Sequence, residues 1–306
     1  MNARPPRGPM GLRQREAWAG WLFAAPALLG LALFMAVPFV LAVGLSFTNL
    51  RLGSPLPTRF VGVENYARLL EDDAFRRALL NNAIFALAVV PLQTALALAL
   101  ALMLNLDLRG RAVYRALFFM PVVFPMALIA VVWQLIYAEG DSGLLNGFLG
   151  AISFGYIEPQ AWLRDPRLAL PAIIVLSIWQ GVGFQMVVLL AGLQAIPRML
   201  YESAALDGAS AWQRLRFVTL PQLRNPLVFT ALITTILAFR VFDQVQIMTR
   251  GGPNRATTTV MYEAIQAAYS RQQVGYAAAM TVVFFVCVLI IALVQRRLVC
   301  EEREVA

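Results

Sequence analysis

The sequence predicts an all-α integral membrane protein, a bundle of six transmembrane helices with a helix–turn–helix insert outside the bilayer. Composition is the first observation behind this fold class. The 306 residues are 60% hydrophobic and only 14% charged, whereas a soluble domain carries about 25% charged residues. The second observation is that the hydrophobic residues form long runs, each exceeding the roughly 20 residues that a helix needs to cross a bilayer. Buried helices of soluble proteins are seldom this long without a charge, so a soluble all-α protein is disfavoured.

Five of these runs, at 17–50, 78–106, 116–138, 168–197 and 272–295, contain no charged residue, and the sixth, at 227–248, contains only Arg240 and Asp243. They predict spans at residues 20–47, 79–105, 115–137, 168–193, 227–248 and 275–296. The first run is about twice as long as the apolar core of a secretory signal peptide, so we expect it to remain as the first span. Prolines inside the first three spans predict kinks or breaks, because each removes a backbone hydrogen bond: Pro26, Pro38, Pro91, Pro121 and Pro125.

Three loops connect the spans on the side opposite the termini. Residues 48–78 predict a turn followed by a short interfacial helix. The second loop includes the apolar stretch 143–149, which is too short to span a bilayer and is predicted to lie in its interface. The third loop begins with Gly251-Gly-Pro253 and continues into a stretch with helix-forming composition that ends near Tyr269.

The distribution of arginine predicts the orientation of the chain. The side that holds both termini carries 14 arginines, and the opposite loops carry 10. Because basic residues accumulate in cytoplasmic loops, both termini and the loop 194–226 are predicted to be cytoplasmic. The chain then divides into a cytoplasmic tail at 1–19, a membrane domain at 20–296 and a second cytoplasmic tail at 297–306.

Two residue types are missing, and their absence excludes several kinds of site. All 25 basic residues are arginine, so the chain lacks the lysine that a phosphate-binding loop places on ATP. It also has no histidine, which removes the Ser–His nucleophile pair and the usual zinc ligands. Cys287 and Cys300 do not have metal-binding spacing. We therefore expect no catalytic residue and no metal ligand. Nucleic-acid binding is disfavoured because no basic run is paired with stacking aromatics.

The segment between the fourth and fifth spans predicts a helix and a sharp turn. Pro197 suits the first turn of a helix, and residues 198–206 are rich in alanine and leucine. Asp207 and Gly208 end this helix, because glycine accepts the left-handed conformation past a helix end. Small residues leave the turn sterically bare, so a partner can approach it closely: Ala204, Ala205, Gly208 and Ala209.

A second helix is predicted after the turn. Ser210 and Gln213 have the spacing of a capping box. Pro221 is predicted to stop this helix. Such an insert is either a docking element for a partner or a loop that only packs against the bundle, and physical reasoning alone leaves both open.

The insert resembles a known motif. Glu202-x-Ala-Ala-x-Asp-Gly-Ala209, with Leu-Pro221 downstream, is similar to the E-A-A motif of the permease subunits of binding-protein-dependent ABC importers. Nearly the whole chain shares the resemblance, which points to the carbohydrate-importer family of the maltose and glycerol-phosphate type. Supporting segments include Val241-Phe-Asp243 and Gly251-Gly-Pro253. Ser203 departs from the common alanine, and the large periplasmic insert of some maltose-type permeases is missing.

The resemblance implies a role for the insert and a set of partners. In this family the motif forms a coupling helix that sits in a cleft of the ATPase subunit. The implied coupling residues are Glu202, Ala205, Asp207, Gly208, Ala209 and Pro221. The implied partners are a second homologous permease, a cytoplasmic ATPase dimer and an extracytoplasmic solute-binding protein. Mg-ATP would bind the ATPase, this chain would hold no cofactor, and the location would be a bacterial cytoplasmic (inner) membrane.

Polar and aromatic residues inside the spans are candidates for the path of a solute. Amide groups suit sugar hydroxyls, and aromatic faces suit sugar C–H surfaces. The candidates of these types are Gln93, Trp133, Gln134, Trp179, Gln180 and Gln185. Each can equally serve ordinary packing and hydrogen bonding between helices.

Arg240 and Asp243 are the ionisable residues inside a predicted span. Three residues apart on one helix, they can face each other as an ion pair that fixes the helix register. The alternative is a polar contact in the solute path or its outer gate. A free positive charge would suit a phosphorylated solute, but a nearby carboxylate argues against one.

The sequence thus predicts the membrane subunit of an ATP-driven importer that moves a sugar or related polyol by alternating access. The alternative is an ion-coupled secondary carrier, although such carriers usually hold several carboxylates or histidines in the membrane. The sequence leaves open whether the solute is a sugar, a polyol or glycerol phosphate.

Overall fold

The computed structural model describes residues 12–55, 57–107, 109–140 and 143–299. Nearly all of this part is helical, and its only bridge is an isolated one between Thr48 and Phe60. The first half contains α1 (Leu12–Leu31), η1 (Ala32–Ala36), α2 (Val37–Ser46), α3 (Glu64–Glu71), α4 (Asp73–Leu104), α5 (Arg111–Val123), α6 (Met126–Ile136) and α7 (Leu144–Ile152). The second half contains α8 (Ala169–Ala195), α9 (Arg198–Leu206), α10 (Ala211–Arg214), η2 (Leu215–Thr219), α11 (Leu220–Gln222), α12 (Arg224–Phe239), α13 (Asp243–Met248), α14 (Val260–Ile265), η3 (Gln266–Ser270) and α15 (Val274–Val299).

The all-helical membrane fold predicted from the sequence is confirmed. Five helical segments in the described ranges are long and apolar enough to cross a membrane: Glu16–Ser46, Asp73–Leu104, Ala169–Ala195, Arg224–Met248 and Val274–Arg297. The bent pair α5 and α6 passes the same test together, and the number of spans is six when this pair is counted as one. The predicted tails at 1–19 and 297–306 lie partly outside the described residues. Helix α1 already begins at Leu12, so residues 12–19 are helical.

The third span differs from the continuous helix expected at 115–137. Helix α5 ends at Val123, Phe124 is extended, Pro125 is the N-cap of α6, and the two helices meet at 100°. Pro125 lacks the amide that would continue the helix, and its ring excludes the helical conformation at Phe124. The break expected from proline therefore occurs here. Pro26 and Pro91 lie inside α1 and α4, and Pro38 lies in the first turn of α2, directly after the wider π-helical turn η1.

Helix α8 is the central element of the bundle. It packs against α4, α5 and α12, and its core residues Ile173, Leu176, Met186 and Leu189 are fully buried. A side chain at Gly183 would clash with the carbonyl oxygen of Phe118 on α5, so glycine permits the close α5–α8 contact.

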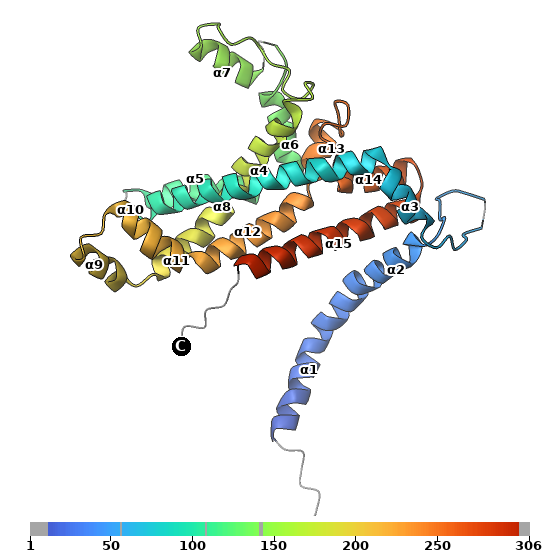
Figure 1. Ribbon diagram of the computed structural model, residues 1–306, viewed down its shortest axis with the longest axis horizontal. Helices are drawn as coiled ribbons and strands as arrows, with labels where there is room; N and C mark the ends of the chain where they lie inside the picture. Colours follow the sequence, from blue (N-terminus) through green and yellow to red (C-terminus); the bar gives the residue numbers. More distant parts are fainter. Residues whose placement is uncertain (1–11, 56, 108, 141–142, 300–306) are drawn as a thin grey trace, which may run out of the picture.

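Helix α1 stands apart from this bundle. Figure 1 shows α1 leading away from α12 and α15, and none of the most apolar part of the first span is buried. The end of that span does contact the bundle, because α2 packs against α15 and the Phe39 and Phe285 ring centroids lie 4.8 Å apart.

The bundle has two distinct ends. Helices α9, α10 and α11 gather at one of them, with the start of α5 and the end of α15, and we call this the α9 end. Helices α3 and α14 lie at the opposite end, which we call the α14 end (Figure 1).

Candidate functional site

The predicted insert is a helix–turn–helix at the α9 end of the molecule. Helix α9, the turn and helix α10 project beyond the membrane spans (Figure 1). Pro197 is the N-cap of α9, one position before the first turn expected for it. The hydroxyl groups of Tyr201 and Thr219 lie 3.0 Å apart, so a hydrogen bond joins α9 to η2.

Gly208 ends α9 in the left-handed conformation that the sequence predicts. Its φ is 74°. The Gly208 amide donates to the carbonyl of Ala205 at 3.1 Å, and the Ala209 amide donates to Ala204 at 2.9 Å. These two bonds form a Schellman motif, which satisfies carbonyls that a helix end leaves free. No atom lies within 4 Å of the position that a Gly208 side chain would take, so the turn is open to solvent.

The predicted capping box at the start of α10 is present. The backbone amide of Gln213 donates to Ser210 Oγ at 3.3 Å, and the backbone amide of Ser210 donates to Gln213 Oε1 at 2.7 Å. The expectation that Pro221 stops the second helix is wrong. Pro221 lies within the short helix α11, which follows the π-helical turn η2 and runs to Gln222. It occupies the first turn of α11, where the missing amide costs little.

The surface of the insert is open. Glu202, Ala205 and Asp207 are exposed, and Leu206 is 90% exposed. Exposed apolar rings follow on the second arm, with Trp212 at 64% and Phe217 at 68%. An exposed apolar surface beyond the spans does not face lipid tails and is typical of a protein interface.

Two of the predicted path residues are buried inside the bundle. Gln185 on α8 is 1% exposed, and its side-chain amide donates to Thr234 on α12. The Oε1 atom of Gln185 is buried without a hydrogen-bond partner. Gln93 on α4 is 6% exposed and fills the space beside Gly181, where a larger residue would collide with its amide group. Packing between helices therefore explains the burial of Gln93. It also explains the side-chain NH₂ group of Gln185, but not its partnerless Oε1 atom.

The aromatic candidates form one group. The Trp133 ring lies 5.5 Å from that of Trp179 and 5.2 Å from that of Tyr137, between centroids. Trp179 is 43% exposed, so it presents a ring face outside the core.

The two remaining glutamines differ in their contacts. Gln134 donates to the carbonyl of Ile247 at 2.7 Å and ties α6 to α13. Gln180 is half-buried and follows Trp179 in the chain.

Arg240 and Asp243 do not form the expected ion pair. Helix α12 ends at Phe239 and α13 begins at Asp243, so the two residues lie on either side of a break. Both are exposed, and neither takes part in a salt bridge within the described part of the chain. Two ionisable groups without a salt bridge to any described residue thus lie within a membrane span.

Side chains from other elements hold this break open. Asn82 on α4 donates to the carbonyl of Phe239 at 3.3 Å and accepts from the Val260 amide at 2.9 Å. Thr259 donates to the carbonyl of Val241 at 3.0 Å. These bonds replace the helical bonds lost at the break. Neither residue was among the sequence candidates, although an Asn81-Asn82 pair at the start of an apolar run was a usable signal.

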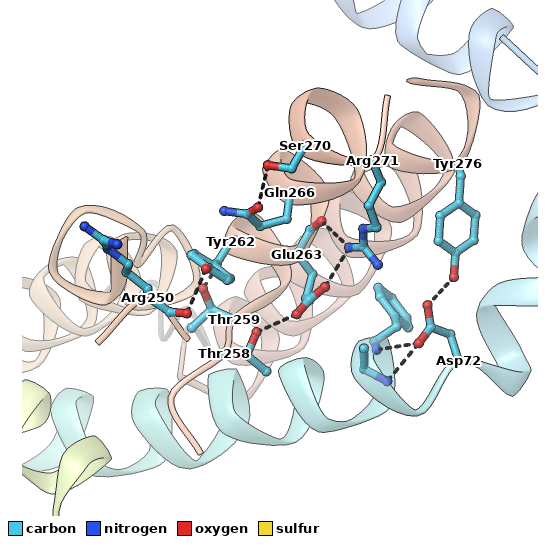
Figure 2. A network of polar contacts seen from close by, with 12 residues as sticks. Asp72, Arg250, Thr258, Thr259, Tyr262, Glu263, Gln266, Ser270, Arg271 and Tyr276 are labelled. Atoms are coloured by element: carbon cyan, nitrogen blue, oxygen red, sulfur yellow. Dashed lines mark hydrogen bonds and ion pairs between the residues drawn. The ribbon is translucent and has the colours of Figure 1, made fainter. Parts of the chain in front are cut away.

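The α14 end is closed by a polar network, which Figure 2 shows. Tyr276 on α15 donates to Asp72, the N-cap of α4, at 2.5 Å. Glu263 on α14 pairs with Arg271 at 2.7 Å and accepts from Thr258 at 2.9 Å. The first contact therefore joins the start of α4 to the start of α15, and the other two brace the segment that connects α13 to α15.

The environment of Asp72 shifts its acidity. Burial raises the pKa of this carboxyl, but the Tyr276 hydroxyl, the backbone amides of Ala74 and Phe75 and the charge of Arg271 together outweigh burial. The pKa of Asp72 consequently lies below its ordinary value. In the described residues, no three His, Cys, Asp or Glu side chains gather as a metal ion would require.

Residues 93–300 match the model of the family described as "Binding-protein-dependent transport system inner membrane component". The chain is 36% identical to the trehalose/maltose transport system permease protein MalF of Thermococcus litoralis, over 91% of this chain and 92% of that protein. It is 34% identical to the lactose transport system permease protein LacF of Rhizobium radiobacter, over 90% and 92%.

A solved structure has the same fold. A chain of a bacterial ABC transporter involved in the import of alginate, an acidic polysaccharide, superimposes with a TM-score of 0.79 at 20% identity. The match covers 95% of this chain and 98% of that one.

Proposed function

The chain belongs to the family of binding-protein-dependent transport system inner membrane components, and we propose that it is the membrane subunit of an ATP-driven sugar importer. It would pass the solute by alternating access, with ATP hydrolysed by a separate subunit. The observation that carries this proposal is the open α9–α10 turn, a stiff element that ends in a bare glycine outside the membrane. The chain has no lysine for a phosphate-binding loop. The free energy of ATP hydrolysis would therefore reach it through contact with an ATPase subunit.

The turn suits an ATPase subunit as its partner. Glu202, Asp207 and the exposed Leu206 present charge and apolar surface together, as protein interfaces do. The Schellman motif and the capping box stiffen both arms, and the Tyr201–Thr219 bond joins them. A displacement of the turn would therefore move α9 and the start of α12 as a rigid body and rotate the spans.

The free-standing α1 suits a second permease subunit. Among the described residues, the first span buries none of its most apolar part against its own bundle, and its α2 end packs against α15. A helix that leaves its own bundle in this way can pack on a neighbouring one. The exposed Arg240 and Asp243 also form no salt bridge among the described residues, so we propose that they face the second subunit or the solute path between the two.

The α14 end suits an extracytoplasmic solute-binding protein. The Asp72–Tyr276 contact joins α4 to α15, and the Glu263–Arg271 contact braces the segment between α13 and α15, so this end offers a preformed docking surface. The excess of arginine on the α9 side supports an orientation with that side and both termini in the cytoplasm of a bacterial cell. The α14 end would then face outward.

A sugar or related polyol is the proposed solute. The support is the trehalose/maltose and lactose transport named for two relatives, together with a half-exposed Trp179 ring. An aromatic face of this kind stacks on the C–H surface of a sugar. Glycerol phosphate fits the same scaffold, and the unpaired Arg240 would suit its charge.

Purification and reconstitution test the proposal. The tagged chain, expressed with its neighbouring genes, should be isolated with an ATPase and a second permease. Proteoliposomes of that complex should take up the sugar only with ATP and the binding protein. Uptake by this chain alone, driven by an ion gradient without ATP, would contradict the proposal and support a secondary carrier.

A further inference from the structure

A polar cavity of about 510 Å³ lies at the α9 end, and neither the turn nor the solute path uses it. Three membrane spans end around it. Asn105 follows the end of α4, Arg111 begins α5, and Leu193 lies in the last turns of α8. The fourth wall is the first turn of α9, with Arg198 and Tyr201. The cavity is therefore placed at the boundary between the membrane spans and the insert.

Positive charge dominates the cavity. Arg111 and Arg198 both line it, and Asp107 supplies one opposing carboxylate. None of these three groups forms a salt bridge within the described residues. Helices α5 and α9 each begin at one of the arginines without a side-chain cap, so their first amides add partial positive charge. Two arginines from separate elements are typical of phosphate recognition.

Apolar surface adjoins the charges. Met103 and Leu106, in the segment that leads to Asp107, are 59% and 61% exposed. The lining of the cavity also includes Leu193 and Ile196, whose side chains are buried. A ligand that fills the cavity can thus place a charged group between the arginines and an alkyl chain along the end of α4. This pattern fits an amphiphile better than a free anion.

We propose that this cavity binds the phosphate headgroup of a phospholipid from the leaflet on the α9 side. Arg111 and Arg198 hold the phosphate oxygens, and Asp107 accepts a hydrogen bond from a headgroup hydroxyl, as phosphatidylglycerol offers. Basic pockets between membrane helices bind anionic headgroups in this way. The inference rests on the chain spanning a bilayer and is independent of the solute and of the ATPase.

The site has a consequence for the insert. Arg198 and Tyr201 belong to the first turn of α9, whereas Arg111 and Asp107 belong to α5 and the segment before it. A bound headgroup would bridge these elements and fix the base of α9 against the bundle. The lipid composition of the membrane would then set how firmly the turn transmits movement.

Lipid binding by the assembled complex tests the site. The complex is exchanged into nanodiscs of phosphatidylglycerol and phosphatidylcholine, and native mass spectrometry counts the lipids that each permease retains. The double variant Arg111→Gln/Arg198→Gln should lose one retained phosphatidylglycerol. The preference of the double variant for phosphatidylglycerol over phosphatidylcholine should fall on the order of tenfold or more. Each arginine near the membrane surface increases the affinity for an anionic lipid about fivefold. The matched control is Arg109→Gln, an exposed arginine of the same segment that does not line the cavity.

The outcomes separate the possibilities. Equal lipid retention by the double variant and the unmodified complex would overturn the proposal. Displacement of the lipid by millimolar glycerol 3-phosphate would show a site for free phosphate and would overturn the lipid assignment. If the double variant does not assemble, a photoreactive phosphatidylglycerol is applied to the unmodified complex. Crosslinks to residues 105–111 or 194–201 support the site, and crosslinks confined to other segments contradict it.

Discussion

The amide of Ala209 donates to the carbonyl of Ala204 at 2.9 Å, across the glycine that ends α9. This bond fixes the direction in which the chain leaves the helix. Because α10 is capped directly afterwards by Ser210, the turn is a defined projection with both arms held. A partner that grips the turn therefore moves two helices instead of a slack loop, which is the requirement for transmitting a displacement to membrane spans.

Reversal of the charge at Glu202 should weaken coupling to the ATPase. Glu202 is exposed on α9, so Glu202→Lys leaves the fold intact and places a like charge against the basic or amide surface that we expect on the partner. Substrate-stimulated ATP hydrolysis should fall on the order of tenfold or more, because like charges across an interface cost several kcal/mol. The control is Glu158→Lys, because Glu158 is an exposed carboxylate on the α7–α8 connection. The rate of ATP hydrolysis of this variant should equal that of the unmodified complex.

Enlargement of Gly183 should destabilise the bundle. A side chain there would meet the carbonyl of Phe118, and backbone cannot yield as a flexible side chain can. Gly183→Val should cost about 1–3 kcal/mol and lower the thermal midpoint of the purified complex. Gly44→Val is the control, because nothing lies within 4 Å of its added carbon. Equal midpoints for the two variants would show that α5 and α8 do not approach as described.

Removal of the Trp179 ring should weaken solute transport without loss of assembly. Trp179 is 43% exposed beside the half-buried Trp133, so Trp179→Ala removes a stacking face and little of the core. The KM for sugar uptake should rise several-fold, since aromatic contacts contribute about 0.5–1.5 kcal/mol beyond their area. Val175→Ala, one turn earlier on α8 and 52% exposed, serves as the control. An unchanged KM would remove Trp179 from the solute path.

Acid should loosen the α14 end through Asp72. Its pKa is lower in the folded protein than in the unfolded chain, so the charged form stabilises the fold. That stabilisation is complete above the ordinary carboxyl pKa of 3.8 and is lost as the pH falls through the lower, folded-state pKa. Asp72→Asn should reduce stability on the order of 1 kcal/mol near neutral pH, a value discounted for the partial exposure of the group.

The control for this effect is the neighbouring carboxylate. Asp73 is 89% exposed and contacts Arg76 only at 3.7 Å, so Asp73→Asn should leave the midpoint unchanged at every pH. Thermal unfolding of the complex between pH 3 and pH 7 measures both variants. The Asp72→Asn variant should show a flatter dependence on pH than the unmodified complex, and identical profiles would rule out the Asp72–Tyr276 contact as the source.

Local signals explain what the sequence predicted well. Gly208, Ser210 and Gln213 act within one turn of chain, so their spacing was enough to predict the left-handed glycine and the capping box. The six spans followed from the lengths of the apolar runs. The Pro125 break was also local, although its 100° angle was not predictable because neighbouring helices set it.

Long-range contacts explain what the sequence did not predict. Residues 239–243 contain neither proline nor glycine, and the helix breaks there because Asn82 and Thr259, distant in sequence, satisfy the freed carbonyls. The expected Arg240–Asp243 pair was lost with that break. The π-helical turn η2 has no local sequence signature, and it places Pro221 in the first turn of α11. For this reason the sequence predicted a helix stop at Pro221 where the helix continues.

The most direct measurement of the central claim is ATP hydrolysis by the assembled complex carrying Gly208→Asp. The φ of 74° strains any side chain at this position, and the added carboxylate would fill the bare turn. Gly155→Asp is the matched control, with a φ of 83° and nothing within 4 Å, but outside the insert. We predict that Gly208→Asp abolishes sugar-stimulated hydrolysis and uptake while Gly155→Asp retains both. Normal coupled hydrolysis and uptake by Gly208→Asp would contradict the assignment of the α9–α10 turn as the point of energy input.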